Sequence, residues 1–204
     1  MKRQPIYFMI DNCNSMKGYA IEKIEECIAG AIKMLRTNPQ AHETNVFCIC
    51  TFGNNKITIQ VGYYWLNEFE INKIECSGYS NINFGLQAVK EHYEKYFIST
   101  TIDKKGDYKP MLFVFSGIAP TTKIDNFLIN FFERKFSQGF LDYIDSFLDD
   151  ELEGKSKKAN NTIIVTSENE YTKNSFENYF SNVFSFEDVD SFVYKFNNFF
   201  KWVS

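Results

Sequence analysis

The sequence lacks most of the patterns that mark a metal-binding, nucleotide-binding or membrane protein. Its five cysteines form no CxxC pair and only two histidines accompany them, which argues against a zinc site. It has neither a G-x-G-x-x-G motif nor a P-loop, so no nucleotide site is predicted. No apolar run is long enough to cross a membrane. These absences point to a protein without a cofactor.

An excess of positive charge is also missing. The 22 basic and 26 acidic side chains give a net charge of -4, so phosphate backbones and anionic lipids are not attracted at long range. We therefore expect no nucleic-acid partner and no membrane contact. The first apolar run, Ile6 to Ile10, is too short for the core of a signal peptide, and the unpaired cysteines suit a reducing compartment. Both features predict a cytoplasmic protein.

The composition is that of a globular chain with one core. Its 204 residues, 44% of them hydrophobic, are enough for one large domain, and no repeat or linker divides them. We expect a single domain over 1–204, with 124–160 as an atypical helical and loop insertion. The 22 Phe and 12 Tyr leave two interpretations open, a nucleotide-composition bias or a specialised aromatic surface.

Apolar runs and apolar stripes alternate along the chain. Short continuous runs predict buried strands, whereas apolar residues three and four apart predict helices. The expected strands cover 6–10, 44–52, 111–115 and 162–166, and the expected helices cover 18–35, 84–97 and 189–203. Helical spacing on either side of Gly139 also predicts two helices or one bent helix over 124–148. The turn Gly53-Asn54-Asn55 predicts an antiparallel strand over 56–61. This order indicates a three-layer, doubly wound α/β fold: a mostly parallel sheet with one antiparallel edge strand and helices on both faces.

Polar loops follow three of the expected elements. They are Asp11 to Ser15, Gly78 to Asn81, and Ser116-Gly117. In an open α/β sheet, ligands bind beyond the carboxyl ends of the strands, so these loops are candidates to meet there. A carboxylate and several hydroxyls brought together would form an oxygen-rich site for a hard divalent cation.

With these loops in place the sequence resembles the von Willebrand factor A domains, and among them the bacterial tellurite-resistance type called TerY. The family's metal-ion-dependent adhesion site (MIDAS) uses D-x-S-x-S, a later Thr, and an Asp before Gly. The corresponding residues here are Asp11, Cys13, Ser15, Ser80 and Ser116. The segments 39–44, 106–110, 119–121 and the ending Phe199 to Ser204 are similar to the TerY type. The stretch 124–160 departs from the family pattern.

The resemblance implies a protein-interaction module whose MIDAS is degenerate. Ser116 brings no second carboxylate, and the soft sulfur of Cys13 suits Mg²⁺ poorly. We therefore expect binding without metal, in a tellurite-resistance or stress-response system, with a kinase or phosphatase of the same gene cluster as the implied partner. The alternative is a working site in which Mg²⁺ recognises an acidic side chain of a partner protein.

Two further interpretations concern the residues around this site. Short polar side chains at a strand-to-helix junction usually cap the helix and bond to one another, which is the structural interpretation of Asp11, Ser15 and Ser80. The functional interpretation is a partner surface, formed by hydrogen bonds from the loops and by exposed aromatic rings. Its candidates are Asn12, Asn14, Tyr79, Asn81, Phe131, Phe132, Phe136 and Phe140.

Catalysis is the weakest interpretation. Neither His42 nor His92 has the spacing of a general base beside a nucleophile. Cys13 remains an alternative, because a thiol at the amino terminus of a helix can have a lowered pKa. We expect a protein that is not an enzyme.

Overall fold

The computed structural model describes residues 2–53, 56–59, 62–136, 162–166, 169–180, 183–185 and 193–194. Within them a seven-stranded sheet has the order β3-β2-β1-β5-β6-β7, and β4 pairs with β2 beside β3. The strands are β1 (Gln4–Asp11), β2 (Asn45–Gly53), β3 (Lys56–Ile59), β4 (Tyr64–Trp65), β5 (Met111–Phe115), β6 (Thr162–Thr166) and β7 (Val183–Ser185). In the sheet order β2-β1-β5-β6-β7 each pair of neighbouring strands is parallel, whereas β3 and β4 run antiparallel to β2.

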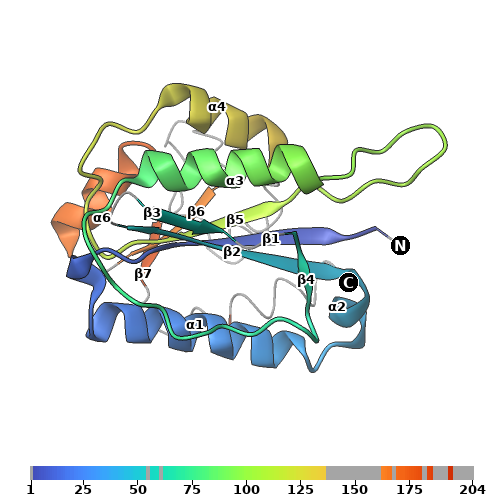
Figure 1. The fold of residues 1–204 in the computed structure, drawn as a ribbon, viewed down its shortest axis with the longest axis horizontal. Helices are drawn as coiled ribbons and strands as arrows, with labels where there is room; N and C mark the ends of the chain where they lie inside the picture. Colours follow the sequence, from blue (N-terminus) through green and yellow to red (C-terminus); the bar gives the residue numbers. More distant parts are fainter. Residues whose placement is uncertain are drawn as a thin grey trace, which may run out of the picture.

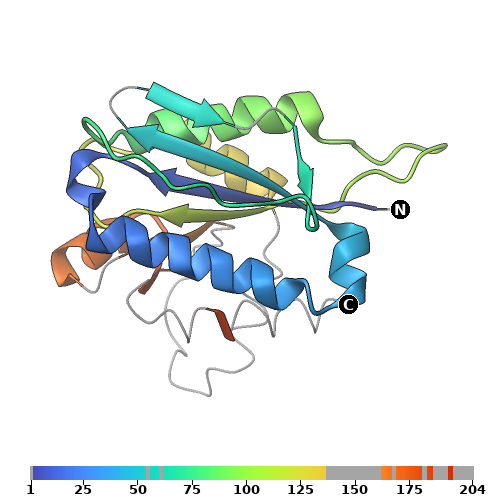
Figure 2. The same cartoon turned by 60° about the horizontal axis from the view of Figure 1, so that its bottom comes forward.

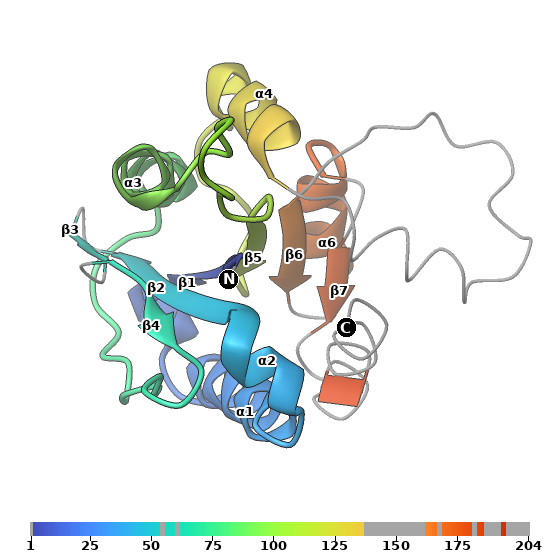
Figure 3. The same ribbon diagram turned by 90° about the vertical axis from the view of Figure 1, so that its right-hand side faces the viewer.

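Helices cover both faces of this sheet. Their bounds are α1 (Tyr19–Leu35), α2 (Pro39–Thr44), α3 (Ile82–Tyr96), α4 (Asn126–Lys135) and α6 (Glu170–Glu177), and a short 3-10 turn, η1 (Asn14–Met16), precedes α1. Figure 1 shows α1 on one face and α3 with α4 on the other, and Figure 3 shows the same layers along the sheet. The described residues include no helix that is long and apolar enough to span a membrane.

The alternation of side chains along β1 divides the core in two. Ile6, Phe8 and Ile10 pack with the apolar face of α1, whereas Tyr7 and Met9 pack with α3 and α4. Successive residues of a strand point to opposite faces, so a strand that is buried on both faces reads as a continuous apolar run. This is why the run 6–10 already predicted a central strand.

The predicted fold class is confirmed. The strands expected at 6–10, 44–52, 111–115 and 162–166 correspond to β1, β2, β5 and β6, and the helices expected at 18–35 and 84–97 correspond to α1 and α3. Helix α4 lies within the helical stretch expected over 124–148, whose part beyond 136 lies outside the described residues. The short elements α2, β4, α6 and β7 were not predicted. Strands of two or three residues carry too few side chains to show a period, and α2 and α6 each extend for only two turns.

Part of the aromatic partner surface predicted on α4 is wrong. Phe132 and Phe136 are fully buried, and their rings pack on each other with centroids 4.8 Å apart. They point toward the sheet because α4 places its apolar stripe against the core next to Tyr7 and Tyr93. Phe131 is half-buried.

Several predictions fall outside the described residues. Phe140, most of the insertion 124–160, and nearly all of the closing helix over 189–203 lie there. The division of the chain into a single domain of 1–204 therefore stays a prediction.

Candidate functional site

The carboxylate of Asp11 lies at the last residue of β1, at the centre of the sheet, and is fully buried. Its Oδ1 accepts a hydrogen bond from the backbone N–H of Cys13 at 2.9 Å. Its Oδ2 lies 2.9 Å from the hydroxyl of Ser116, which follows the neighbouring parallel strand β5. The same hydroxyl lies 3.1 Å from the carbonyl oxygen of Ile118, and its single hydrogen goes to the charged acceptor. Both oxygens of Asp11 are thus engaged within the protein.

The loop after β1 is tied to the loop before α3 through its backbone. The N–H of Asn14 donates to the carbonyl of Gly78 at 3.0 Å, and the N–H of Ser77 donates to the carbonyl of Asn12 at 2.8 Å. The Nδ2 of Asn12 also donates to the carbonyl of Glu75 at 2.8 Å. Gly78 has a φ of 65°, which favours glycine at this turn. The two loops therefore form one connected surface.

The third loop, after β5, joins the other two. The N–H of Gly117 contacts the sulfur of Met16 at 3.1 Å, and the hydroxyl of Thr121 donates to the carbonyl of Ser80 at 2.9 Å. The three loops 11–16, 77–81 and 116–121 thus meet at the carboxyl edge of the sheet, and we call them the crown. Ser80 is joined to the third loop through its carbonyl group.

Helix capping by the crown differs from the prediction. The N-cap of α1 is Gly18, at a φ of 86° and without a side-chain cap, so Asp11 and Ser15 do not cap that helix. The cap of α3 is Asn81, whose side chain accepts from the N–H of Asn83, so Ser80 does not cap it. The capping interpretation was wrong because η1 separates Asp11 from α1 and turns the chain before the helix begins.

The crown exposes polar and aromatic side chains. Asn14 and Ser15 are exposed, Asn12 and Asn81 are half-buried, and Tyr79 has 84% of its surface accessible. These side chains have free surface for a partner, in contrast to Asp11 and Ser116, which lie beneath them in the core.

Cys13 is buried, and burial together with the nearby Asp11 carboxylate raises the pKa of its thiol to about 12. The backbone amides of Ser15 and Met16 act in the opposite direction but are outweighed. The thiol is therefore protonated at neutral pH, and the interpretation of Cys13 as an activated nucleophile is wrong.

Neither histidine lies in the loops of the crown. His92 is buried in α3, where Nδ1 lies 3.0 Å from the hydroxyl of Tyr7 and Nε2 lies 3.1 Å from the carbonyl of Gly62. His42 is in α2, and its Nε2 lies 2.8 Å from the carbonyl of Arg36. Each histidine has a structural partner instead of a nucleophile.

The donor set of the crown fits a hard divalent cation poorly. Among the described residues there is no group of three or more His, Cys, Asp or Glu side chains that could hold a metal ion. Asp11 is the sole carboxylate of the crown, both its oxygens are hydrogen-bonded, and Cys13 offers sulfur. Mg²⁺ prefers several hard oxygen ligands in octahedral geometry, which these residues do not supply.

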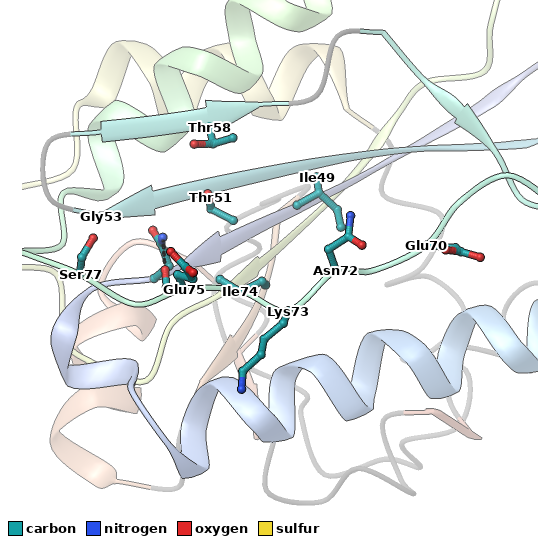
Figure 4. Close-up of a pocket in the computed structure, with 11 residues that line it drawn as sticks. Ile49, Thr51, Gly53, Thr58, Glu70, Asn72, Lys73, Ile74, Glu75 and Ser77 are labelled. Carbon is teal, nitrogen blue, oxygen red and sulfur yellow. Dashed lines mark hydrogen bonds between the residues drawn. The ribbon is translucent and has the colours of Figure 1, made fainter.

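A groove of about 340 Å³, which no pattern in the sequence indicated, opens beside the crown. It lies between the β2–β3 hairpin and the extended segment 70–77, and Figure 4 shows the side chains that face it. Its lining includes Ile49, Thr51, Thr58, Glu70, Ile74 and Glu75. Asn12 of the crown lines it as well, so crown and groove are continuous.

No protein-family model matches the chain, and no curated protein matches it either. Solved structures are similar to it in fold. Proximal thread matrix protein 1 from the mussel byssus, in a structure with a zinc-occupied MIDAS motif, has a TM-score of 0.55 at 13% identity over 96% of this chain. This chain spans 45% of that protein, so it corresponds to less than half of its length.

Two further structures extend the likeness. The SpRpn10 VWA domain has a TM-score of 0.52 at 12% identity, and the match covers 92% of this chain and 94% of that domain. The pilus adhesin SpaC from Lactobacillus rhamnosus GG, in its open conformation, has a TM-score of 0.58 at 9% identity over all of this chain and 30% of the adhesin. At such identities the likeness concerns the fold alone. This chain has the α/β fold of the von Willebrand factor A domains.

Proposed function

We propose that this protein is a von Willebrand factor A-type interaction module that binds a protein partner at its crown without a metal ion. The observation that carries the proposal is the hydrogen bond of 2.9 Å between Ser116 and Asp11. A neutral hydroxyl that donates to the carboxylate takes the place of a second anionic ligand, and the charge of Asp11 is satisfied internally.

The exposed side chains of the crown are the groups left to recognise a partner. Tyr79 provides a large ring with a phenolic hydroxyl, and Asn14 and Asn81 provide amides, whereas the amide of Asn12 already donates to Glu75 and its Oδ1 is buried. Such side chains form direct or water-mediated hydrogen bonds, and exposed tyrosines are frequent energetic centres of protein interfaces. The loops beneath are already connected by hydrogen bonds, so little ordering accompanies binding.

The alternative function is metal-dependent recognition of an acidic side chain. It is favoured by the fold and by Asp11 at the end of β1, and proximal thread matrix protein 1 has a zinc-occupied MIDAS motif on the same fold. The donor set of this chain argues against it. We also infer, from the TerY resemblance alone, a cytoplasmic stress-response or tellurite-resistance system with a kinase or phosphatase partner.

Co-purification with metal control separates the two functions. The tagged protein is used to isolate partners in parallel buffers that contain EDTA or millimolar Mg²⁺, and the double variant Asn14→Ala, Tyr79→Ala is compared with the wild type. Tyr108→Ala is the matched control, because Tyr108 is also exposed but lies at the opposite edge of the sheet. We expect a partner that is retained in EDTA, lost from the double variant and kept by the control.

Calorimetry provides the direct measurement of metal binding. Titration of the wild type with Mg²⁺ and Mn²⁺ should give no saturable heat, and Asp11→Asn should leave this result unchanged. Saturable binding that Asp11→Asn abolishes, together with a partner lost in EDTA, would establish the metal-dependent alternative.

A further inference from the structure

A projecting loop at the amino edge of the sheet has no role in the crown. Residues 98–107, which we call the finger, follow α3 and lead toward β5. Figures 1 and 2 show the finger, in yellow-green, extending beyond the sheet near the amino terminus. Its tip carries a fully exposed Ile102, followed by the exposed Asp103, Lys104 and Lys105.

The finger is held firmly at its base. The guanidinium of Arg3 donates to both oxygens of Asp107, at 2.8 and 2.7 Å, and the backbone N–H of Ile98 donates to Asp107 Oδ2 at 2.9 Å. Asp107 N–H donates in turn to the carbonyl of Ile98 at 2.7 Å. A bidentate pair of this kind fixes geometry as well as charge. The base is therefore a built connection between the finger and β1.

The tip is shaped by two further contacts. The N–H of Thr101 donates to the carbonyl of Lys104 at 2.9 Å, which closes a turn around Ile102. A Cβ at Gly106 would overlap the backbone of Ile98 and Thr100, so glycine lets the two sides of the finger approach closely. A branched apolar side chain is thus presented to solvent by a loop that is already ordered, which lowers the entropy lost on docking.

The groove beside the crown is complementary to this tip. Ile49 and Ile74 offer apolar surface, and the volume of about 340 Å³ is large enough for an isoleucine side chain. Glu70 and Glu75 are exposed and line the groove, and among the described residues neither forms an ion pair. In Figure 4 the side chain of Lys73 points toward α1, away from the sheet. The tip, with two lysines and one aspartate beside Ile102, therefore has a net positive charge, whereas the groove has two glutamates beside two isoleucines.

A finger cannot occupy the groove of its own chain. Its base joins Arg3, next to the start of β1, whereas Thr51 lies six residues into β2, about 20 Å along the strand direction. Figures 1 and 2 show the finger pointing away from the sheet. We propose that the finger of one copy docks into the groove of a second copy, with Ile102 between Ile49 and Ile74 and with Lys104 and Lys105 facing Glu70 and Glu75.

This contact is head-to-tail. Each copy offers both surfaces, so association proceeds to short chains or closes into a ring, unlike the self-limiting pairing of a two-fold dimer. The tip is small compared with the 1,200 Å² or more that stable interfaces bury, so we expect association only at about 100–1,000 µM. The proposal does not depend on the function assigned to the crown.

Sedimentation velocity over a concentration series tests the contact. We expect the average sedimentation coefficient of the wild type to rise with concentration. Either Ile102→Asp or the pair Glu70→Lys, Glu75→Lys should raise the dissociation constant about tenfold or more, so that the coefficient stays flat over the same concentrations. Tyr171→Asp is the control, because it places the same charge at another exposed hydrophobic side chain, on α6, and should associate like the wild type. Circular dichroism of each variant checks that it remains folded.

Mixing the two kinds of variant provides the decisive result. The Ile102→Asp chain keeps its groove and the groove variant keeps its finger, so each is monomeric alone but together they form a dimer that does not grow. A chain whose finger carries Lys104→Glu and Lys105→Glu should bind the groove variant again, because the charges of finger and groove are then exchanged and once more opposite. A mixture that stays monomeric would overturn the proposal, and so would a wild type that is monomeric at every concentration. Binding of the finger to phosphatidylcholine–phosphatidylglycerol vesicles by such a monomeric wild type would assign it to a lipid surface instead, and would also overturn the proposal.

Discussion

The hydroxyl of Tyr7 lies 3.0 Å from Nδ1 of His92, and the two side chains join β1 to α3 inside the core. The Tyr7 hydroxyl also lies 2.6 Å from the hydroxyl of Tyr63, and His92 Nε2 faces the carbonyl of Gly62. A neutral imidazole satisfies this chain, with Nε2–H donating to Gly62 and Nδ1 accepting from Tyr7. Burial lowers the pKa of His92 below its ordinary value of 6.5, because the charged form loses its hydration.

The first prediction concerns stability against pH. Because the pKa of His92 is lower in the folded than in the unfolded protein, its neutral form stabilises the fold fully above about pH 6.5. That contribution is lost as pH falls through the lowered folded pKa. Thermal unfolding followed by circular dichroism should give a midpoint that declines from pH 7.5 toward pH 5.5, and His92→Gln should flatten this slope. A His92→Gln slope equal to that of the wild type would contradict the assignment.

The second prediction concerns Ser116→Ala. The substitution leaves the buried Oδ2 of Asp11 without its 2.9 Å donor, so we expect a loss of about 1–3 kcal/mol in the free energy of unfolding. Urea denaturation measures it. Asp11→Asn in the Ser116→Ala background serves as the control, because removing the charge should recover part of the loss.

The third prediction concerns Ser116→Asp. A second carboxylate beside the buried Asp11 should raise the pKa of one of the two groups and lower the unfolding free energy by about 1–3 kcal/mol at neutral pH. It also supplies the second hard, charged ligand that the wild type lacks. We expect the unfolding midpoint of this variant to fall in EDTA and to rise in millimolar Mg²⁺, with no such rise in the wild type. A wild-type midpoint that rises in Mg²⁺ as much as that of the variant would refute metal-free binding.

The fourth prediction concerns thiol reactivity. Cys13 and Cys50 are buried, and burial raises the pKa of each thiol to about 12, whereas Cys76 is half-buried. Burial also raises the pKa of Cys76, so its thiol should react more slowly than a fully exposed one but before the buried thiols. Titration of the folded protein with a disulfide reagent at pH 8 should label Cys76 before any other cysteine of the described residues. Cys76→Ser should remove that phase, and Cys13→Ser should leave it unchanged.

The fifth prediction concerns Gly53, at the end of β2. A Cβ there would lie 2.7 Å from Asn12 Oδ1 and 2.9 Å from the backbone of Asn12, so Gly53→Ala must displace the loop after β1. We expect a loss of about 1–3 kcal/mol in unfolding free energy, measured by urea denaturation. A loss below the error of that measurement would show that the loop moves aside without strain.

The sequence predicted the fold well where single elements carry a clear period. The run 6–10 had to be a central strand because it is apolar at every position, and its end at Asp11 placed that carboxylate at the edge where Ser116 also lies. Parallel neighbours share an edge, so the meeting of these two residues followed from the predicted topology.

The rest depended on contacts that periodicity does not encode. The groove forms because segment 70–77, which has no regular structure, is held by two hydrogen bonds: Asn12 Nδ2 donates to the carbonyl of Glu75, and the N–H of Ile74 donates to the carboxylate of Glu25. The burial of Phe132 was missed because α4 is apolar on more than one side, and Phe127 of the same helix is the ring left exposed. Which side faces the core is decided by the neighbouring helix α3.

Asn12 belongs at once to the crown and to the lining of the groove. Its backbone carbonyl and its side-chain amide both hold the strip 75–77, one residue beyond the anchored Asp11. A molecule that binds in the groove and shifts this strip must therefore also move the crown, and a partner of the crown that shifts it must move the groove. A ligand that shifts the strip from one surface then alters the affinity of the other, and thermodynamic reciprocity requires the same factor in both directions.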